Sequence, residues 1–203
     1  MENVIDSWKN KNVFIKQLDL NLKELTSYNT YPEHWKVFIE FLKINKPKSI
    51  LDIGCGCGSY YELIRRFDSN IKYVGVDYSV DAINIAKQKW NHDDFYVKNY
   101  SELTPDYVSS FDLIHMGALL DVLPNADEVL EFILSLSAKS LIIGRVKLTN
   151  KSSYYDVYTA YDEIKTYAYY HNSNNFYEIC EKNGYKLINN NNNFLLIKND
   201  GTL

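Results

Sequence analysis

The sequence has few cysteines, no long apolar run and no excess of basic residues, and each absence excludes a class of protein. Three cysteines in 203 residues do not form a disulfide framework, and such a chain fits a reducing, cytoplasmic compartment. No segment approaches the roughly 18 consecutive apolar residues that a membrane span needs. The opening MENVIDSWKNKN lacks the apolar stretch of a secretory signal. We therefore expect a cytoplasmic protein with no membrane partner.

The charge balance and composition are those of an ordinary globular domain. The chain has 22 Lys and Arg against 26 Asp and Glu, a net charge of −4. A nucleic-acid clamp needs a basic face, so we expect no nucleic-acid partner. Hydrophobic residues make up 46% of the chain, which excludes intrinsic disorder, and its 203 residues suit one domain.

Short apolar runs alternate with helical patterns through the middle of the chain. This alternation is typical of βαβ units, which build a mostly parallel sheet with right-handed crossovers. The predicted strands are 49–53, 71–77, 94–99, 111–116 and 140–146. The predicted helices between them are 61–67, 80–90 and 126–137.

The two ends of the chain depart from that alternation. Residues 32–42 have apolar side chains at helical spacing, and 3–25 form a weaker helical pattern. Near the other end, a predicted helix over 174–185 precedes two apolar runs, 185–188 and 194–198. Five consecutive asparagines separate these runs. Because Asn tolerates positive φ, this pattern predicts an antiparallel hairpin that closes the sheet.

The strongest motif is a glycine-rich loop, LDIGCGCGSYY, between a predicted strand and a predicted helix. Gly54, Gly56 and Gly58 let the backbone turn sharply and let a ligand approach the main chain. The amino end of the helix that follows offers free N–H groups. A dinucleotide fingerprint, G-x-G-x-x-G, would require its third glycine at Ser59, where glycine is absent.

Two carboxylates accompany this loop. Asp52 precedes the glycines, at a position suited to a cationic ligand. Asp77 ends the next predicted strand, where a carboxylate can accept both hydroxyls of a ribose. A glycine loop combined with an acid at the end of the next strand indicates a nucleoside-binding site.

These motifs resemble those of the class I S-adenosylmethionine-dependent methyltransferases. LDIGCGCG resembles the family's first motif, VGVDYS its second-strand motif, and FDLIHMGALLDVLPN its fourth strand with the following helix; the resemblance covers about 32–198. It implies an α/β fold with a doubly wound, seven-stranded, mostly parallel sheet, in the order 3-2-1-4-5-7-6 with the last strand antiparallel. We expect an N-terminal helical lid (1–48) and a methyltransferase domain (49–203) with a Tyr-rich cap insertion (151–173).

The resemblance also implies the cofactor, S-adenosyl-L-methionine, and the residues that bind it. The glycines would lie under its methionine and ribose, Asp52 would orient the ammonium group, Asp77 would bind the ribose diol and Tyr78 would pack on the adenine. Asn99 departs from the family, which often has Asp there. The expected cofactor contacts are Asp52, Gly54, Cys55, Gly56, Gly58, Asp77, Tyr78, Asn99, Tyr100, Met116, Gly117 and Tyr31. No metal is expected, because the C-x-C pair lacks further ligands nearby.

The acceptor site is less clearly marked in the sequence. Methyl transfer is a displacement at an activated carbon, so positioning dominates, but a hydroxyl acceptor also needs a group that takes its proton. His115, His171 and Asp121 are the candidates for that role. Each has a structural alternative: a packed or hydrogen-bonded core residue for a lone histidine, and a local helix cap for Asp121.

A cation and a cluster of aromatic residues are candidates for substrate contacts. Arg145 follows the fifth strand and can meet an anionic group of the substrate, or lie on the surface. Residues 152–177 hold eight of the 18 tyrosines, and tyrosine rings suit sugars or amphipathic small molecules. We expect Tyr161 and Tyr170 to form a wall of the acceptor site, although codon bias is an alternative explanation for the tyrosines.

The sequence therefore predicts a methyltransferase acting on a small polar acceptor. A sugar or nucleotide-sugar hydroxyl is favoured and an amine comes next. The base-methylation motif [DN]-P-P-[YF] is missing, since HMGA stands at the fourth strand. Two alternatives stay open: a non-methylating transferase or binding protein for an adenosyl ligand, and an NAD-dependent oxidoreductase. The chain is compatible with a monomer or a homodimer.

Overall fold

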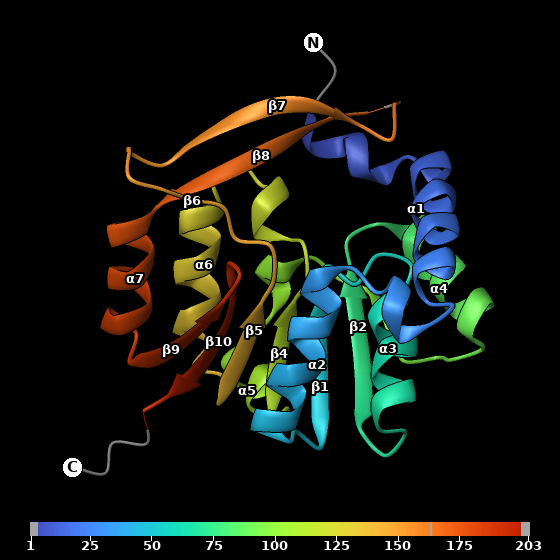
Figure 1. The fold of residues 1–203 in the computed structure, drawn as a ribbon, viewed down its shortest axis with the longest axis horizontal. Coiled ribbons are helices and arrows are strands. Elements are labelled where there is room, and N and C mark those ends of the chain that lie inside the picture. Colours follow the sequence, from blue (N-terminus) through green and yellow to red (C-terminus); the bar gives the residue numbers. More distant parts are fainter. Residues whose placement is uncertain (1–3, 163, 200–203) are drawn as a thin grey trace.

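A computed structural model describes residues 4–162 and 164–199, which are built around a seven-stranded sheet (Figure 1). Its strand order is β3-β2-β1-β4-β5-β10-β9, and β10 runs antiparallel to both of its neighbours. Numbered along the chain, this is the predicted order 3-2-1-4-5-7-6, and the predicted fold is confirmed. The strands are β1 (Ser49–Ile53), β2 (Lys72–Asp77), β3 (Phe95–Val97), β4 (Leu113–Met116), β5 (Ser140–Ile143), β9 (Tyr185–Asn190) and β10 (Asn193–Lys198).

Helices cover both faces of this sheet. The α-helices are α1 (Lys11–Glu24), α2 (Glu33–Asn45), α3 (Ser59–Phe67), α4 (Val80–Trp90), α5 (Pro105–Ser109), α6 (Ala126–Ser135) and α7 (Ser173–Lys182). Four short 3-10 helices lie among the described residues: η1 (Val4–Lys9), η2 (Tyr28–Thr30), η3 (Tyr100–Glu102) and η4 (Leu120–Val122). None of the helices in the described part of the chain has the length and apolar character to cross a membrane.

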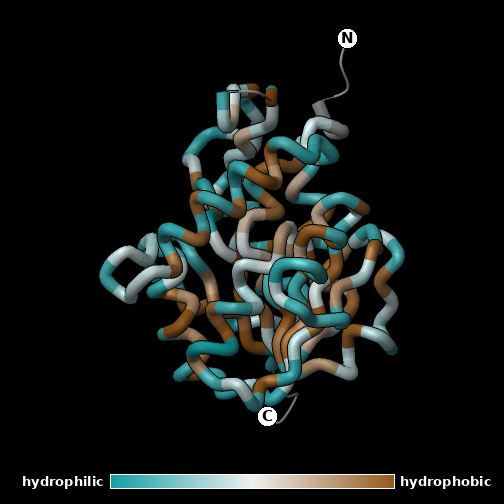
Figure 2. The backbone as a smooth tube through the Cα atoms, turned by 90° about the vertical axis from the view of Figure 1, so that its right-hand side faces the viewer, coloured by the Kyte–Doolittle hydropathy of each residue, from teal (hydrophilic) through white to brown (hydrophobic). Residues whose placement is uncertain are grey.

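The alternation of side chains along each strand creates two apolar layers. Ile50 and Leu113 belong to the cluster beneath α2, α3 and α4, whereas Leu51 and Ile114 belong to the cluster beneath α6 and α7. Figure 2 shows the hydrophobic residues concentrated in this central region. Because both faces are covered, the central strands β1 and β4 are mostly apolar, as parallel strands in such folds are, with Asp52 and His115 as buried exceptions.

The asparagine run forms a tighter turn than the sequence suggested. Only Asn191 and Asn192 have positive φ, 49° and 58°, and β9 and β10 extend into the neighbouring asparagines. The predicted hairpin is thus confirmed, with a two-residue turn instead of a five-residue one. Asn193 is buried and its side chain bonds backbone groups of the same loop and of the adjacent strand end.

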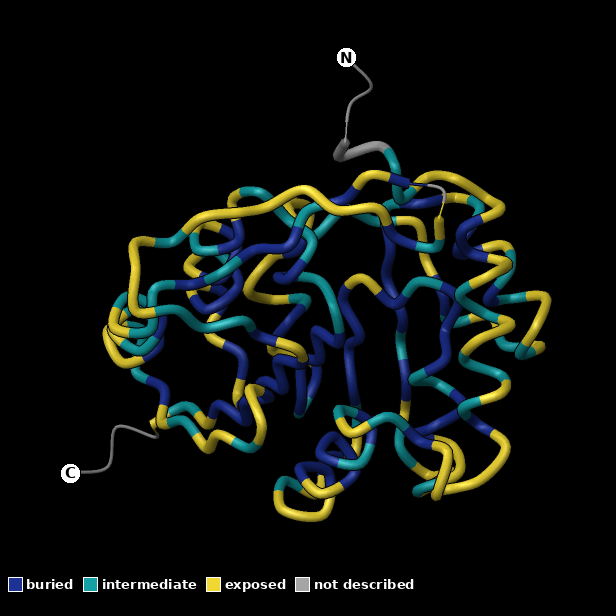
Figure 3. Tube along the Cα trace, turned by 45° about the horizontal axis from the view of Figure 1, so that its top comes forward, coloured by how far each residue is buried: buried dark blue, intermediate teal, exposed yellow. Residues whose placement is uncertain are grey.

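The Tyr-rich segment folds into a second, smaller sheet that the sequence did not predict. Its strands are β6 (Leu148–Thr149), β7 (Tyr154–Ala160) and β8 (Ile164–Asn172), in the order β6-β8-β7. The β7–β8 hairpin arches over the carboxyl ends of the main strands (Figure 1). Its outer strand β7 is exposed along most of its length (Figure 3).

The tip of this hairpin meets the N-terminal segment. Trp8 Nε1 donates to Thr166 Oγ1 at 2.7 Å, and Lys16 Nζ donates to the backbone oxygen of Tyr161 at 3.3 Å. Val13, Ala160 and nearby rings form a small apolar cluster at the same junction. Of the segment expected to be a lid (1–48), η1 and α1 therefore lie by the hairpin and the glycine loop, whereas α2 packs on the sheet.

Candidate active site

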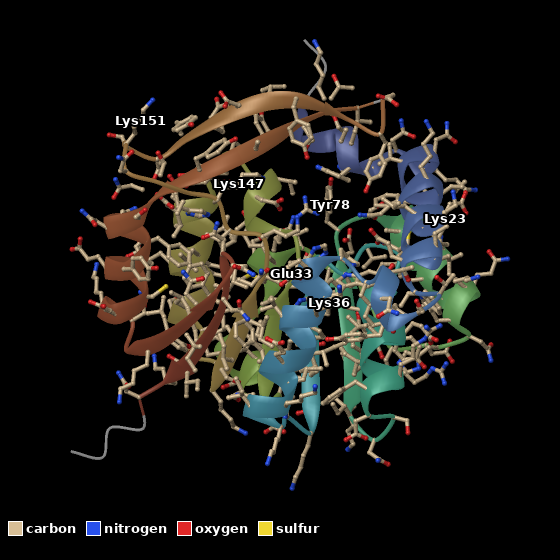
Figure 4. The ribbon with its side chains drawn as sticks, viewed as in Figure 1. Lys23, Glu33, Lys36, Tyr78, Lys147 and Lys151 are labelled. Atoms are coloured by element: carbon tan, nitrogen blue, oxygen red, sulfur yellow. The ribbon has the colours of Figure 1, made fainter. Side chains whose placement is uncertain are left out.

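A cavity of about 610 Å³ lies between the carboxyl edge of the main sheet and the β7–β8 hairpin. We divide its lining into a glycine-loop half (Gly54, Gly56, Asp77 and Tyr78) and a cap half (Arg145, Tyr158 and Tyr161). Figure 4 shows Tyr78 in this space, between the strand ends and the hairpin. In doubly wound sheets, ligands bind at this edge.

A second hollow of about 920 Å³ lies elsewhere on the surface, bordered by Lys43, Lys46, Phe67 and Lys72. It is larger and more open, but the polar side chains around it are exposed or half-exposed. The smaller cavity, in contrast, contains a nearly buried carboxylate, Asp77. Buried charges are expensive unless a ligand or partner uses them, so we assign the functional site to the smaller cavity.

The glycine loop owes its shape to left-handed backbone angles. Gly54, Gly56 and Gly58 have φ of 74°, 52° and 75°, a region that other residues adopt only with strain. Gly58 also has a packing role, because a Cβ there would lie 2.7 Å from the Phe95 ring. Gly54 and Gly56 line the cavity, whereas Gly58 faces the Phe95 and Trp90 side chains.

Asp77 lies at the end of β2 with both carboxylate oxygens held by backbone amides. Oδ2 accepts from Gly56 N at 3.0 Å and Oδ1 from Ser79 N at 2.9 Å. Burial raises the pKa of Asp77 above its usual value, and these amide hydrogen bonds oppose that shift. Each oxygen retains a lone pair for a further donor. A carboxylate fixed beside Gly56 and Tyr78 fits a ribose diol.

Asp52 and His115 face each other across β1 and β4, where they are register partners. His115 Nδ1 lies 2.7 Å from one Asp52 oxygen, and Tyr73 OH donates to the other at 2.7 Å. Both residues are 1% exposed, and the His115 ring lies 4.1 Å from the Tyr60 ring, centroid to centroid. This arrangement is a closed network beneath the glycine loop, and neither side chain lines the cavity.

The residues that follow β3 in the sequence form the opposite end of the glycine-loop half. Lys98, Asn99 and Tyr100 line the cavity there. Asn99 Oδ1 accepts from the Ser101 amide at 3.1 Å and so caps η3. The amide nitrogen of Asn99 forms no hydrogen bond within the described residues. That group can donate to a ligand, which an aspartate at this position could not do.

The cap half centres on Arg145, whose backbone has φ of 61°. Its amide donates to Asn193 Oδ1 at 3.0 Å, and its Nη2 lies 3.2 Å from Asp121 Oδ2. The Asp121 charge raises the pKa of Arg145 in spite of burial, so this cation is permanent. Lys147 Nζ lies 3.4 Å from the same Asp121 oxygen.

His34, in the first turn of α2, is a neighbour of the cap half that sequence reasoning missed. Burial, Arg145 and His115 lower its pKa to about 4. The imidazole is therefore neutral near pH 7. No motif surrounds His34 in the sequence, and only the folding of α2 against the sheet brings it near Arg145 and His115.

Residues 29–190 match the model of a protein family described as a methyltransferase domain. This match covers well over half of the 203 residues. The chain belongs to this methyltransferase family. The cofactor of the family is S-adenosylmethionine, as the motifs implied.

Solved methyltransferase structures share the fold at low sequence identity. The human N-acetylserotonin methyltransferase, in complex with S-adenosylmethionine, has 12% identity and a TM-score of 0.67, over 97% of this chain and 59% of that chain. An S-adenosylmethionine-dependent methyltransferase from Clostridium acetobutylicum has 14% identity and a TM-score of 0.63, over 92% of this chain and 98% of that chain. A sugar N-methyltransferase from Streptoalloteichus has 10% identity and a TM-score of 0.60, over 90% of this chain and 93% of that chain. The chain thus spans 59% of the human enzyme and nearly all of the two bacterial ones.

The cofactor residues predicted for this methyltransferase fall into two groups. Gly54, Gly56, Asp77, Tyr78, Asn99 and Tyr100 line the cavity. Asp52, Cys55, Gly58, Met116, Gly117 and Tyr31 lie outside its lining. Members of the second group are mostly buried supports: a Cβ on Gly117 would lie 2.5 Å from Tyr60, and Tyr31 packs edge-on against Trp35. Their direct contact with the cofactor stays a prediction.

The two loop cysteines are protonated and enclosed. Burial raises the pKa of the Cys57 thiol to about 12 and that of Cys55 well above its usual value. Cys57 Sγ donates to the Phe14 carbonyl oxygen. Within the described residues, no three side chains of the kinds that ligate metals form a cluster.

The three candidate proton acceptors occupy different surroundings. His171 is a buried residue of β8 in the cap itself, with Nδ1 2.5 Å from Asp127 Oδ1, and it lies outside the cavity lining. His115 is enclosed with Asp52. Asp121 is buried beside Arg145, and its Oδ1 has no hydrogen-bond partner among the described residues. Of the three, Asp121 has the most direct link to a cavity-lining residue; all three roles stay predictions.

The predicted aromatic wall is realised by different tyrosines. Tyr161 lines the cavity, whereas Tyr170 stacks on Tyr154 with centroids 4.8 Å apart, outside the lining. Tyr158 takes the second wall position. Tyr154 and Tyr158 point to the same face of β7, and Tyr161 lies in the turn. Position along the hairpin therefore decides which of these rings line the cavity, and the sequence alone did not reveal the strands. Sequence reasoning also missed the N-terminal lining residues Trp8, Phe14 and Gln17.

Proposed function

We propose that this chain transfers the methyl group of S-adenosylmethionine to a small polar acceptor, with a sugar or nucleotide-sugar hydroxyl favoured over an amine. The observation that carries the proposal is the Asp77 carboxylate, held by two amides beside Gly54 and Gly56 at the floor of a capped cavity. This geometry supplies the acceptors for a ribose diol next to a backbone surface that a ligand can approach closely.

The residues of the glycine-loop half divide the binding of the cofactor among them. Asp77 accepts the ribose hydroxyls, Tyr78 lies on the adenine and the Asn99 amide donates to it. The Asp52–His115 network fixes the strand ends below. When bound, the cofactor supplies a methyl group activated by a sulfonium, and the chain mainly positions the acceptor in line with it.

The cap half receives the acceptor. Tyr158 and Tyr161 offer apolar faces with hydroxyl tips, which suit a sugar or another small polar molecule. For a hydroxyl acceptor, the neutral His34 near Arg145 is the candidate that takes the proton, while Asp121 is held in its ion pairs with Arg145 and Lys147. The hairpin and the N-terminal segment close the cavity above and limit the entry of water. Two methyltransferases of this fold are named for small acceptors, N-acetylserotonin and a sugar, which supports the proposal.

Ligand binding to wild type and Asp77→Ala tests the cofactor assignment. We expect S-adenosylhomocysteine and S-adenosylmethionine to raise the melting temperature by several degrees, because a ligand at 100 times its Kd stabilises by about 2.7 kcal/mol. NAD should give no shift. Asp77→Ala should remove the shift, while the exposed control Asp19→Ala should retain it. A shift with NAD alone would overturn the assignment.

Product formation then tests the reaction. The protein is incubated with S-adenosylmethionine and a panel of sugars, nucleotide sugars and amines, and S-adenosylhomocysteine is quantified. We expect acceptor-dependent product from at least one hydroxyl or amine class. Strong cofactor binding with no product across the panel would favour a binding protein or a non-methylating transferase of the same fold.

A further inference from the structure

The cap half has the features of an anion-binding subsite. Gly144 precedes Arg145, and a Cβ at Gly144 would lie 2.6 Å from the Gly117 backbone oxygen. The chain therefore leaves β5 in close contact with the end of β4. It then enters the left-handed conformation at Arg145, where Asn193 holds the backbone amide. A left-handed non-glycine residue at such a position is characteristic of functional sites, and here it sets the direction of a cavity-lining guanidinium.

Hydrogen bonding leaves most of this guanidinium free. Nη2 pairs with Asp121, but Nε and Nη1 have no hydrogen-bond partner among the described residues, and the side chain is 44% exposed. An arginine offers five N–H donors in a planar fork. Asp121 is thus a positioning residue that anchors one arm of the fork.

The charges of the subsite do not cancel. Arg145 and Lys147 share one Asp121 oxygen, so two cations face one carboxylate and one positive charge remains. The nearby His34 is neutral, because its pKa is lowered to about 4. The tyrosines that complete the wall, Tyr158 and Tyr161, have pKa values raised by burial and are neutral donors. A local positive charge in a chain of net charge −4 favours an anionic ligand.

From this arrangement we infer that the acceptor carries an oxyanion group, a carboxylate or a phosphate, which binds the free arm of Arg145. The inference rests on the proposed function, in which the cap half holds the acceptor. Guanidinium and oxyanion match in charge and in bidentate geometry, and the tyrosine hydroxyls can donate to the same group.

The test titrates acetate, its neutral isostere acetamide and inorganic phosphate into the protein saturated with S-adenosylhomocysteine. Ligand-observed NMR measures the binding of each probe. Acetate or phosphate should bind saturably, with a Kd on the order of millimolar, and acetamide about tenfold more weakly or less. The stronger of the two anions identifies the oxyanion. Equal binding of acetate and acetamide, or no saturable binding of either anion, would overturn the inference.

Two substitutions locate the effect. Arg145→Met should weaken binding of the anion about tenfold or more, and Arg145→Lys, which keeps the charge without the fork, should weaken it less. Arg65→Met is the matched control, since Arg65 is also half-exposed and paired with a buried carboxylate, Glu62. It should leave anion affinity unchanged. Equal affinities in wild type and Arg145→Met would contradict the inference.

Calorimetry with S-adenosylhomocysteine on the same proteins separates two kinds of failure. If the adenosyl ligand does not bind to wild type, the proposed function fails. If it binds to wild type and to Arg145→Met while the anions do not depend on Arg145, only the inference about the acceptor fails.

Discussion

The glycine-loop half of the cavity is held together by backbone, whereas the cap half is held by side chains from distant segments. In the first, Asp77 is fixed by amides of Gly56 and Ser79, within one βα unit and its neighbour. In the second, contacts such as Trp8 to Thr166 join residues 158 positions apart. Backbone geometry tolerates little change, while a wall of side chains can vary with the ligand. We therefore expect substitutions in the glycine-loop half to disturb the backbone, and substitutions in the cap half to change mainly the contacts with a ligand.

The largest expected effect of breaking the glycine-loop half is on folding itself. Gly58→Ala places a Cβ 2.7 Å from the Phe95 ring at a φ of 75°. We expect a loss of about 2–4 kcal/mol in the free energy of unfolding, from overpacking and backbone strain. Gly56→Ala, whose Cβ would meet only Gln17 at 3.4 Å, should cost less. Urea denaturation measures both, and equal costs would show that packing against Phe95 is unimportant.

A milder change in the same half should affect binding more than folding. Asp77→Asn keeps the shape of the side chain but removes the charge that, in the proposed function, accepts the ribose hydroxyls. Hydrogen bonds to charged groups contribute roughly 1.5–3 kcal/mol each, so the affinity for S-adenosylhomocysteine should fall about 100-fold. Isothermal titration calorimetry provides the value. A change below about threefold would remove Asp77 from the cofactor site.

The attachment of the cap can be weakened through Asp127. Its carboxylate accepts hydrogen bonds from Ser153 and Asn175 and contacts His171 Nδ1. Burial alone would raise the pKa of Asp127, but these hydrogen bonds lower it below the usual 3.8. The stabilisation is therefore present above pH 3.8 and is lost as the pH falls through the lower folded-state value.

We expect Asp127→Asn to lower the free energy of unfolding at pH 7 by about 1–2 kcal/mol. The difference from wild type should shrink below pH 3.8, where the unfolded carboxyl of the wild type is protonated. Chemical denaturation across this range provides the measurement. A difference that does not change with pH would show that the ionised carboxylate is not what anchors the cap.

The lowered pKa of His34 predicts that the stability of the folded protein depends on pH. Its pKa is lowered from 6.5 to about 4 in the folded protein. Between these values the unfolded chain takes up a proton that the folded protein does not, so stability should fall as the pH decreases from 6.5 to about 4. His34→Gln should reduce this slope in denaturation curves. Identical slopes in both proteins would contradict the burial of His34 beside Arg145.

The smallest effect is expected from single hydroxyls of the cap. Tyr161 lines the cavity and Tyr170 does not, so Tyr161→Phe and Tyr170→Phe form a matched pair. Tyr161→Phe should raise the KM of the acceptor about three- to tenfold with little change in kcat, as expected for a lost ground-state contact. Tyr170→Phe should leave both unchanged. A larger effect of Tyr170→Phe would mean that the acceptor binds farther along the hairpin, beside the Tyr154–Tyr170 stack.

Much of the fold followed from local patterns. The parallel sheet and the closing hairpin agree with the structure, because strand alternation, glycine turns and the asparagine run are short-range features. The order of the strands, which also agrees, was implied by the resemblance to the methyltransferase family. The Tyr-rich hairpin was missed as secondary structure. Its strand β7 is exposed at nearly every position, so it lacks the alternation of polar and apolar residues that marks a half-buried strand.

The candidate site shows the same division. Gly54, Gly56, Asp77 and Tyr78 could be placed from the sequence, because they lie in motifs at the ends of consecutive strands. His171 and Tyr170 could not, because a residue's distance from the cavity depends on how the cap pairs and docks. Trp8 and His34 carry no motif at all; packing of the N-terminal helices brings them to the site.

The sequence by itself determined the alternation of strands and helices and the glycine loop with its acid at the next strand end, since both depend on residues that are neighbours along the chain or at consecutive strand ends. The order of the strands was implied by the resemblance of these motifs to the methyltransferase family. Only the tertiary structure decided which tyrosines, cations and histidines lie together over that loop. Their proximity depends on long-range docking of the cap and the N-terminal segment, which no local pattern encodes. The excess of one positive charge around Arg145 results from the same docking, because it places Asp121 beside Arg145 and Lys147.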